Sequence, residues 1–189
     1  MRRTLNQAIE LIKQGTSHDM DDRLFDECLH IMSQIKFQQI YDLCPEVYKL
    51  LKSDSEVLRQ EAVKTLGYRL HVKEFRDMAY DIWLNDESDE VRGSALLSWC
   101  SFYVNSKNKD VLEKLYRIFT NKKFKSNIKA IAYVGFFETV LFNYPGCNMS
   151  QSFDLLLSCK DPAQFNKNMN WPAIKDIMRK YVPDVMIDE

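Results

Sequence analysis

The sequence predicts an all-α protein of stacked helix pairs, and three observations lead to this prediction. First, one helical phrase recurs, with clear copies at residues 54–67 and 87–99. Second, weaker copies anchored at Leu24 and Ile128 join those anchored at Leu58 and Val91, so the spacings are 34, 33 and 37 residues. Third, apolar residues recur at helical spacing, and no sustained period-two run indicates a strand. Repeats of this length stack to share one core.

Each recurring phrase is expected to form the second helix, called B, of a hairpin whose first helix is called A. The expected B helices cover residues 22–35, 55–70, 88–103 and 126–142. Apolar stripes at helical spacing predict the A helices, namely Leu5, Ala8, Ile9 and Ile12; Val47, Tyr48 and Leu51, with Pro45 in the first turn; Phe75, Met78, Ala79, Ile82 and Trp83; and Leu112, Leu115, Tyr116 and Phe119. Residues 36–44 fit either a short extra helix or an extension of the first B helix.

Two more helices are expected after the turn at Pro145 and Gly146. Their apolar stripes are Met149, Phe153, Leu156 and Leu157, and then Trp171, Ile174, Ile177, Met178 and Tyr181. Asn170 is the expected cap of the second helix, with Pro172 in its first turn. We therefore expect a single domain over residues 1–189, with repeats at about 4–35, 36–70, 72–105 and 108–144 and a C-terminal cap at 145–189.

The clear copies resemble the HEAT-repeat family in its short form, which reads acidic residue, Val-Arg, Ala and Leu-Gly. The matching residues are Asp54, Arg59, Ala62, Leu66 and Gly67 in one copy, and Glu87, Val91, Arg92 and Ala95 in the next, where Trp99 replaces the Leu. The outer copies depart, because Phe25 and Lys129 stand where the Arg is expected. The resemblance covers about residues 4–144 and implies a right-handed α-α superhelix (alpha solenoid) of about four hairpins plus C-terminal capping helices.

The repeated residues have structural roles in this interpretation. A small residue at Ala62 or Ala95 lets neighbouring helices approach closely. The acidic residue, such as Asp54, is expected to cap the B helix and to face its dipole. Arg59 and Arg92 are expected to pair with acidic groups at neighbouring turns.

Composition and motifs favour a binding protein over an enzyme. The 26 basic and 27 acidic residues nearly balance, which does not favour wholesale electrostatic binding to nucleic acid. The 5 Cys are odd in number and include no C-x-x-C, as expected for buried thiols in a reducing compartment. The sequence has no secretory signal pattern and no run of about 20 apolar residues, so we expect a cytoplasmic protein without membrane insertion. The 3 His have no metal-ligand spacing, and phosphate-loop and nucleophile motifs are absent, so we expect no catalytic residue, metal or cofactor.

Two surfaces are candidates for binding. The B helices of HEAT-like stacks usually line the concave side, and the resemblance marks that side as the binding surface. Its candidate residues are Asp26, Glu27, His30, Gln34, Gln60, Glu61, Lys64, Tyr68, Ser94, Leu97, Ser101 and Glu138. The second surface is a basic turn, Lys122, Lys123, Lys125 and Lys129, which could contact an anion or an acidic partner. Over residues 107–129, 8 basic against 2 acidic residues give a local net charge of 8 − 2 = +6.

The expected function is a non-enzymatic protein-protein interaction through the concave B-helix face. Such a module could be a regulator, an adaptor or an immunity-type protein that neutralises a toxin, and its partner is another protein. An alternative is nucleic-acid binding by the Lys122–Lys129 cluster, as in HEAT-like DNA glycosylases, although Trp83 and Trp99 lie in apolar stripes and the proposed groove is not basic. A third hypothesis, a chromophore-lyase-like role, rests only on the occurrence of similar repeats in phycobilin lyases.

Overall fold

The computed structural model describes Glu10, residues 44–140 and residues 167–185, and this part of the chain is helical with connecting loops and no strand. The predicted all-α class is thus confirmed. The chain divides into two compact units, residues 1–102 and 103–189, which are described one after the other. The helices expected over residues 5–12, 22–35 and 149–157, together with residues 36–43, lie outside the described residues. The interpretation of residues 1–189 as one domain stays a prediction.

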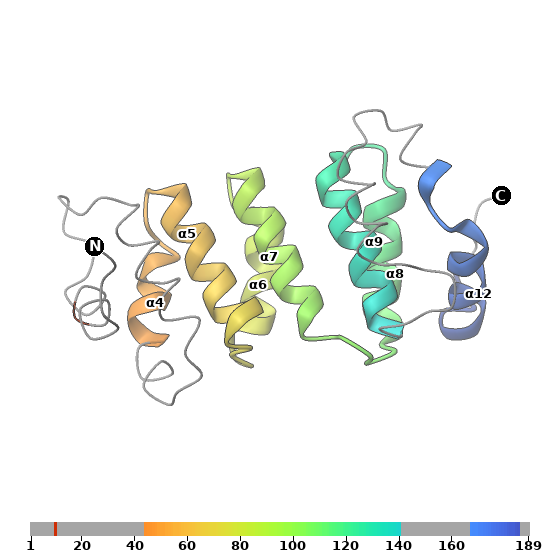
Figure 1. The fold of residues 1–189 in the computed structure, drawn as a ribbon, viewed down its shortest axis with the longest axis horizontal. Helices are drawn as coiled ribbons and strands as arrows, with labels where there is room; N and C mark the ends of the chain where they lie inside the picture. The colour runs from red at the N-terminus through yellow and green to blue at the C-terminus, as the bar shows by residue number, and fades with distance from the viewer. Residues whose placement is uncertain (1–9, 11–43, 141–166, 186–189) are drawn as a thin grey trace, which may run out of the picture. The chain divides into compact units, whose positions relative to one another are not determined.

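The first unit contains a short helix followed by three long helical segments. They are α4 (Cys44–Leu50), α5 (Glu56–Val63) continued by the π-helix η1 (Lys64–Arg69), α6 (Phe75–Asn85) and α7 (Asp89–Ser101). In Figure 1, α5 and α7 lie beside each other, and α6 packs against α7. The predicted B helices are therefore neighbours. Phe75, Ala79 and Trp83 form the buried stripe of α6, but Met78, which was expected in that stripe, is exposed.

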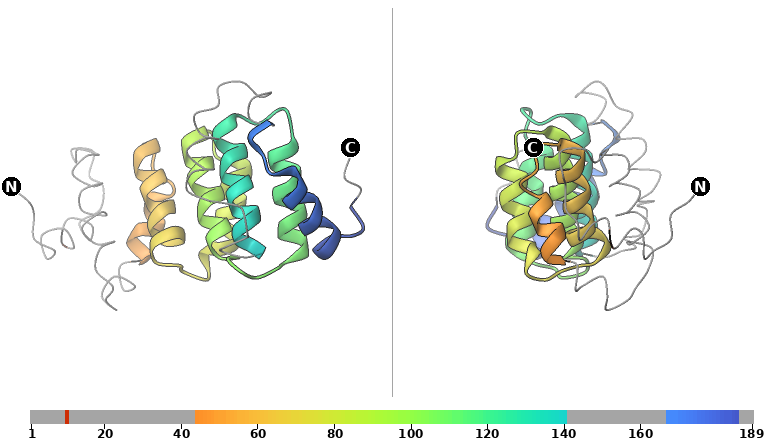
Figure 2. Two further views of the ribbon diagram at one scale, coloured as in Figure 1. Left: turned by 45° about the vertical axis from the view of Figure 1, so that its right-hand side comes forward. Right: turned by 90° about the vertical axis from the view of Figure 1, so that its left-hand side faces the viewer.

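The second unit contains α8 (Lys109–Thr120), α9 (Ser126–Val140) and α12 (Trp171–Tyr181). The left view of Figure 2 shows α8 and α9 running side by side, and the two helices pack against each other. The buried hydroxyl of Tyr133 on α9 accepts a hydrogen bond from the N–H of Asn170 at 3.0 Å, which fixes the start of α12. The predicted cap is confirmed, because the Asn170 side chain accepts from the N–H of Ala173.

Burial follows the repeat in both units. The anchor positions Leu58, Val91 and Ile128 are all buried, and so are the small positions Ala62, Ala95 and Ala132. The next core position is filled by Leu66, Trp99 and Phe136, which are also buried. These three aligned positions are therefore buried in each described B helix, as expected of repeats.

A glycine sets the close approach of η1 to α7. A Cβ atom built on Gly67 would lie 2.8 Å from Oγ of Ser98 and closer still to its Cβ. The Ser98 hydroxyl donates to the carbonyl of Val63 at 3.2 Å, so the two B helices are also joined by a buried hydrogen bond. The sequence predicts a continuous α-helix over residues 55–70, whereas the structure widens its last part into a π-helix, with the N–H of Leu70 donating to the carbonyl of Thr65.

The helix ends repeat as well, but their caps differ from the prediction. Left-handed residues follow both B helices of the first unit: His71 has φ 50° and Asn105 has φ 56°, 105 − 71 = 34 residues later. At the start of α7 the cap is Ser88, whose hydroxyl accepts from the N–H groups of Glu90 and Val91. The expectation that the acidic residue caps the B helix is wrong here, because the nearby carboxylates bind an arginine instead.

Candidate functional site

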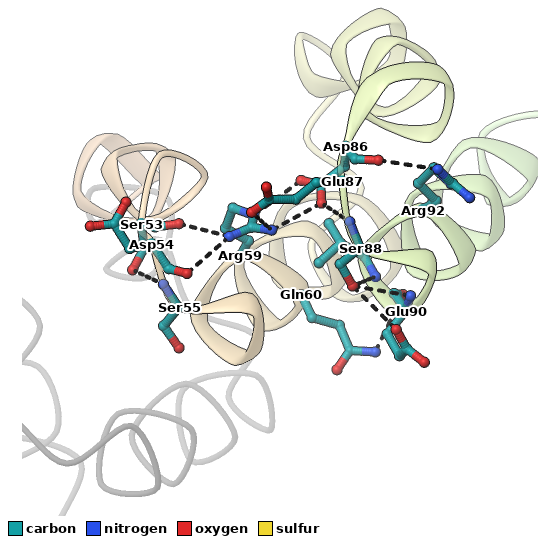
Figure 3. A network of polar contacts seen from close by, with 11 residues as sticks. Ser53, Asp54, Ser55, Arg59, Gln60, Asp86, Glu87, Ser88, Glu90 and Arg92 are labelled. Atoms are coloured by element: carbon teal, nitrogen blue, oxygen red, sulfur yellow. Dashed lines mark hydrogen bonds and ion pairs between the residues drawn. The ribbon is translucent and has the colours of Figure 1, made fainter.

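The polar centre of the first unit is the guanidinium of Arg59, which is buried with 7% of its surface exposed. Its Nε and Nη2 donate to the two carboxylate oxygens of Asp86, each at 3.1 Å. Nη2 also donates to Glu87 at 3.2 Å, and Nη1 donates to the carbonyls of Ser53 and Asp54 at 3.0 and 3.2 Å (Figure 3). All five N–H donors of the guanidinium are therefore used.

This cluster, which we call the Arg59 clamp, joins two turns of successive hairpins. Burial by itself raises the pKa of Asp86, but the hydrogen bonds from Arg59 and from the N–H of Ser88, with the charges of Arg59 and Arg92, hold the pKa below its ordinary value. The predicted pairing of Arg59 with acidic groups at a neighbouring turn is confirmed. Arg92 occupies the same repeat position, and its side chain contacts Asp89 on its own helix and the carbonyl of Asp86.

An open depression of about 330 Å³ lies over the clamp. It is lined by Lys52, Ser53, Asp54, Arg59, Asn85, Asp86 and Glu87. Because every N–H of Arg59 is already hydrogen-bonded, the guanidinium has no donor left for a ligand. The arrangement is that of a structural staple, as the repeat pattern predicted.

The B-helix face has a regular order of exposed positions. Aligning the B helices places Val57 with Glu90 and Asn127, and all three are exposed. Lys64, Leu97 and Val134 share a second position and are half-buried. A third position is held by Tyr68, Ser101 and Glu138, of which Tyr68 is the most exposed at 54%. We call these three positions the B face.

In the first unit, the side chain of Gln60 joins the two B helices beside this face. The side chain of Gln60 donates to Oγ of Ser94 at 3.1 Å and lies 3.4 Å from the carbonyl of Glu90. Two predicted partner-binding residues, Glu61 and Ser94, are buried, so their expected exposure is wrong. Glu61 instead forms ion pairs with Lys64 and Arg69, at 2.6 and 3.0 Å. The two buried residues share one repeat position with Ile131, which is half-buried.

The remaining predicted face residues are distributed as follows. Gln60, Lys64, Leu97, Ser101 and Glu138 are half-buried and Tyr68 is exposed. Asp26, Glu27, His30 and Gln34 lie outside the described residues. The sequence-based selection omitted Val57, Ile131 and Val134, which are exposed or half-buried. The repeat register alone aligns Val57 with the exposed Glu90 and Val134 with the half-buried Leu97, whereas Ile131 aligns with the buried Glu61 and Ser94.

The basic turn is smaller than the local charge suggests. Lys107 precedes α8, Lys109 is its first residue and Lys122 follows it, so these lysines lie at opposite ends of a helix that is about 18 Å long at 1.5 Å per residue. Lys122, Lys123 and Lys125 are exposed, but Lys129 is buried with 3% of its surface exposed. Burial lowers the pKa of Lys129. The expectation that Lys129 takes part in a surface cluster is therefore wrong.

The described part of the chain offers no metal cluster and no membrane span. Within residues 44–140 and 167–185, no group of three or more His, Cys, Asp and Glu side chains is placed to hold a metal ion. No helix in these ranges combines the length and the apolar character needed to cross a bilayer. No protein-family model matches the sequence, and neither a characterised protein nor a solved structure is significantly similar to it.

Proposed function

We propose that this chain is a HEAT-like alpha solenoid that binds another protein through the B face. One observation carries the proposal: the aligned Val57 and Glu90 are both exposed and the aligned Lys64 and Leu97 are both half-buried, so the two B helices of the first unit present rows of side chains to solvent. Such rows suit an extended partner surface, as in other stacked-repeat proteins. The proposal covers a regulator, an adaptor or an immunity-type protein equally.

The composition of the B face supports a protein partner. In the first unit it combines an exposed aromatic ring, Tyr68, with the apolar Val57 and Leu97, the polar Ser101 and the charged Lys64 and Glu90. Aromatic residues set among polar ones are enriched where proteins bind each other. The nucleic-acid alternative has less support, because the basic residues near α8 are spread along the length of this helix and Lys129 is buried.

The test is copurification of the tagged chain from the cells that express it naturally, read by quantitative mass spectrometry. Tyr68→Ser disrupts the B face, and Leu84→Ser on α6 is its matched control, because both side chains are 54% exposed. We expect a stoichiometric partner whose recovery falls about 10-fold or more with Tyr68→Ser, as for an aromatic residue at an interface centre, and is unchanged with Leu84→Ser. A partner that both variants lose equally, or that neither loses, would contradict the proposal.

A further inference from the structure

The carboxylate of Glu138 differs from every other buried or half-buried carboxylate in the described residues. Five of the six such side chains form an ion pair with a lysine or arginine. The pairs are Glu46 with Lys49, Glu61 with Lys64 and Arg69, Asp86 with Arg59, Asp89 with Arg92, and Glu113 with Arg117. Glu138, the sixth, has no hydrogen bond or ion pair to its carboxylate. Burial raises the pKa of Glu138, and no neighbouring cation offsets this effect.

Nothing among the described residues stabilises the charged form of the Glu138 carboxylate. Glu138 lies on α9, where partial burial disfavours the charged form of its side chain. Its backbone carbonyl, not its side chain, accepts the hydrogen bond from the N–H of Asn105 at 2.7 Å. A glutamine would fit the same space without the cost of partial desolvation. A group that is unfavourable for the folded chain alone is a candidate for a role with a partner.

The surroundings of Glu138 define the chemistry of that partner. Ile131 and Val134 precede it by seven and four residues, so the three side chains lie on one face of α9. All three are half-buried, and together they present an apolar strip that ends in a carboxylate. An arginine side chain complements this strip, since its methylene stem packs on apolar surface and its guanidinium pairs with a carboxylate through two hydrogen bonds.

We propose that Ile131, Val134 and Glu138 form a subsite for an arginine side chain of a protein partner. The inference rests on the proposed function, because Glu138 holds the same repeat position as Tyr68 on the B face. The inference specifies that the group recognised by this part of the face has the positive charge and the shape of an arginine side chain.

The test selects random peptides on the full-length chain by display and then measures their affinities by fluorescence anisotropy. Each selected peptide is also made with citrulline in place of arginine, which keeps the shape but removes the charge. We expect arginine to be enriched, and the citrulline change to weaken binding to the unmodified chain about 10-fold or more. With Glu138→Gln the same change should have less than about a 2-fold effect, whereas Glu90→Gln, which changes an exposed carboxylate of the B face, should behave like the unmodified chain.

Three results would overturn the subsite: no peptide is enriched, the enriched peptides lack arginine, or citrulline weakens binding to Glu138→Gln as much as to the unmodified chain. The failure of this inference is distinguishable from that of the proposed function. Peptides that lose binding with Tyr68→Ser but not with Glu138→Gln would leave the B face in place and refute only the arginine subsite.

Discussion

Replacing Arg59 by methionine should destabilise the first unit more than any surface charge change. The substitution keeps the length of the side chain but removes the guanidinium that binds Asp86, whose own side chain is only 12% exposed. Removing one partner of a buried ion pair costs about 3–5 kcal/mol. Asp86 keeps the hydrogen bond from the N–H of Ser88, so we expect the low end, about 3 kcal/mol. The pair with Glu87 adds little, because that side chain is 84% exposed.

The assay is urea unfolding of the full chain at neutral pH for Arg59→Met, Asp86→Asn and the double variant. The two side chains form one hydrogen-bonded unit. The loss of unfolding free energy in the double variant should therefore be about 2 kcal/mol smaller than the sum of the losses in the two single variants. Arg76→Met is the control, since the Arg76 side chain is exposed and its ion pair with Asp77 lies on the surface, so the change in stability should be less than about 0.5 kcal/mol. A loss below about 1 kcal/mol for Arg59→Met, or additive single losses, would refute the role given to the clamp.

The clamp also predicts a pH dependence. The pKa of Asp86 is lower in the folded chain than its ordinary value of 3.8, so the unfolded chain binds more protons as the pH falls below that value. The stability that the clamp contributes is therefore present above pH 3.8 and is lost as the pH falls through the folded pKa. The difference in stability between the unmodified chain and Arg59→Met should shrink over that acidic range. A constant difference would contradict the ion pair.

Three further predictions concern packing, backbone strain and a buried charge. Gly67→Ala should destabilise the chain by about 2 kcal/mol in urea unfolding, because the added Cβ overlaps Ser98. Adding Ser98→Gly should recover part of this loss, and equal stability of the single and the double variant would contradict the close approach. Lys107→Gly should stabilise by about 0.5 kcal/mol because φ is 56° there, whereas Lys107→Ala should give no gain by the same measurement. Burial raises the pKa of Glu138 above 4.5, so Glu138→Gln and the unmodified chain should be equally stable below that pH. As the pH rises, Glu138→Gln should become the more stable of the two, and parallel curves of stability against pH would argue against the desolvated carboxylate.

The helical repeat was predictable because its signal is local. Apolar spacing in α6, α8 and α12 and the spaced anchor positions specify which face of each helix is buried, independently of how the helices are arranged. The exposure of the B face was harder to predict. Glu61 and Ser94 are polar but buried, whereas Ile131, at the same repeat position, and Val134 are apolar and half-buried. Residue type alone gave the wrong exposure for Glu61 and Ser94. Repeat register, which aligns Val134 with Leu97, gives the right exposure for Val134 but not for Ile131.

Long-range polar contacts depended on tertiary structure. The sequence by itself determined the all-α class, the bounds of the described B helices to within a few residues and the pairing of Arg59 with an acidic turn, since all three follow from periodicity and from charges fixed at repeat positions. Only the tertiary structure decided that Lys129 is buried and that, among the described residues, no cation lies beside the Glu138 carboxylate. Those outcomes depend on which side chains from distant segments meet in space, and short-range periodicity carries no information about such meetings.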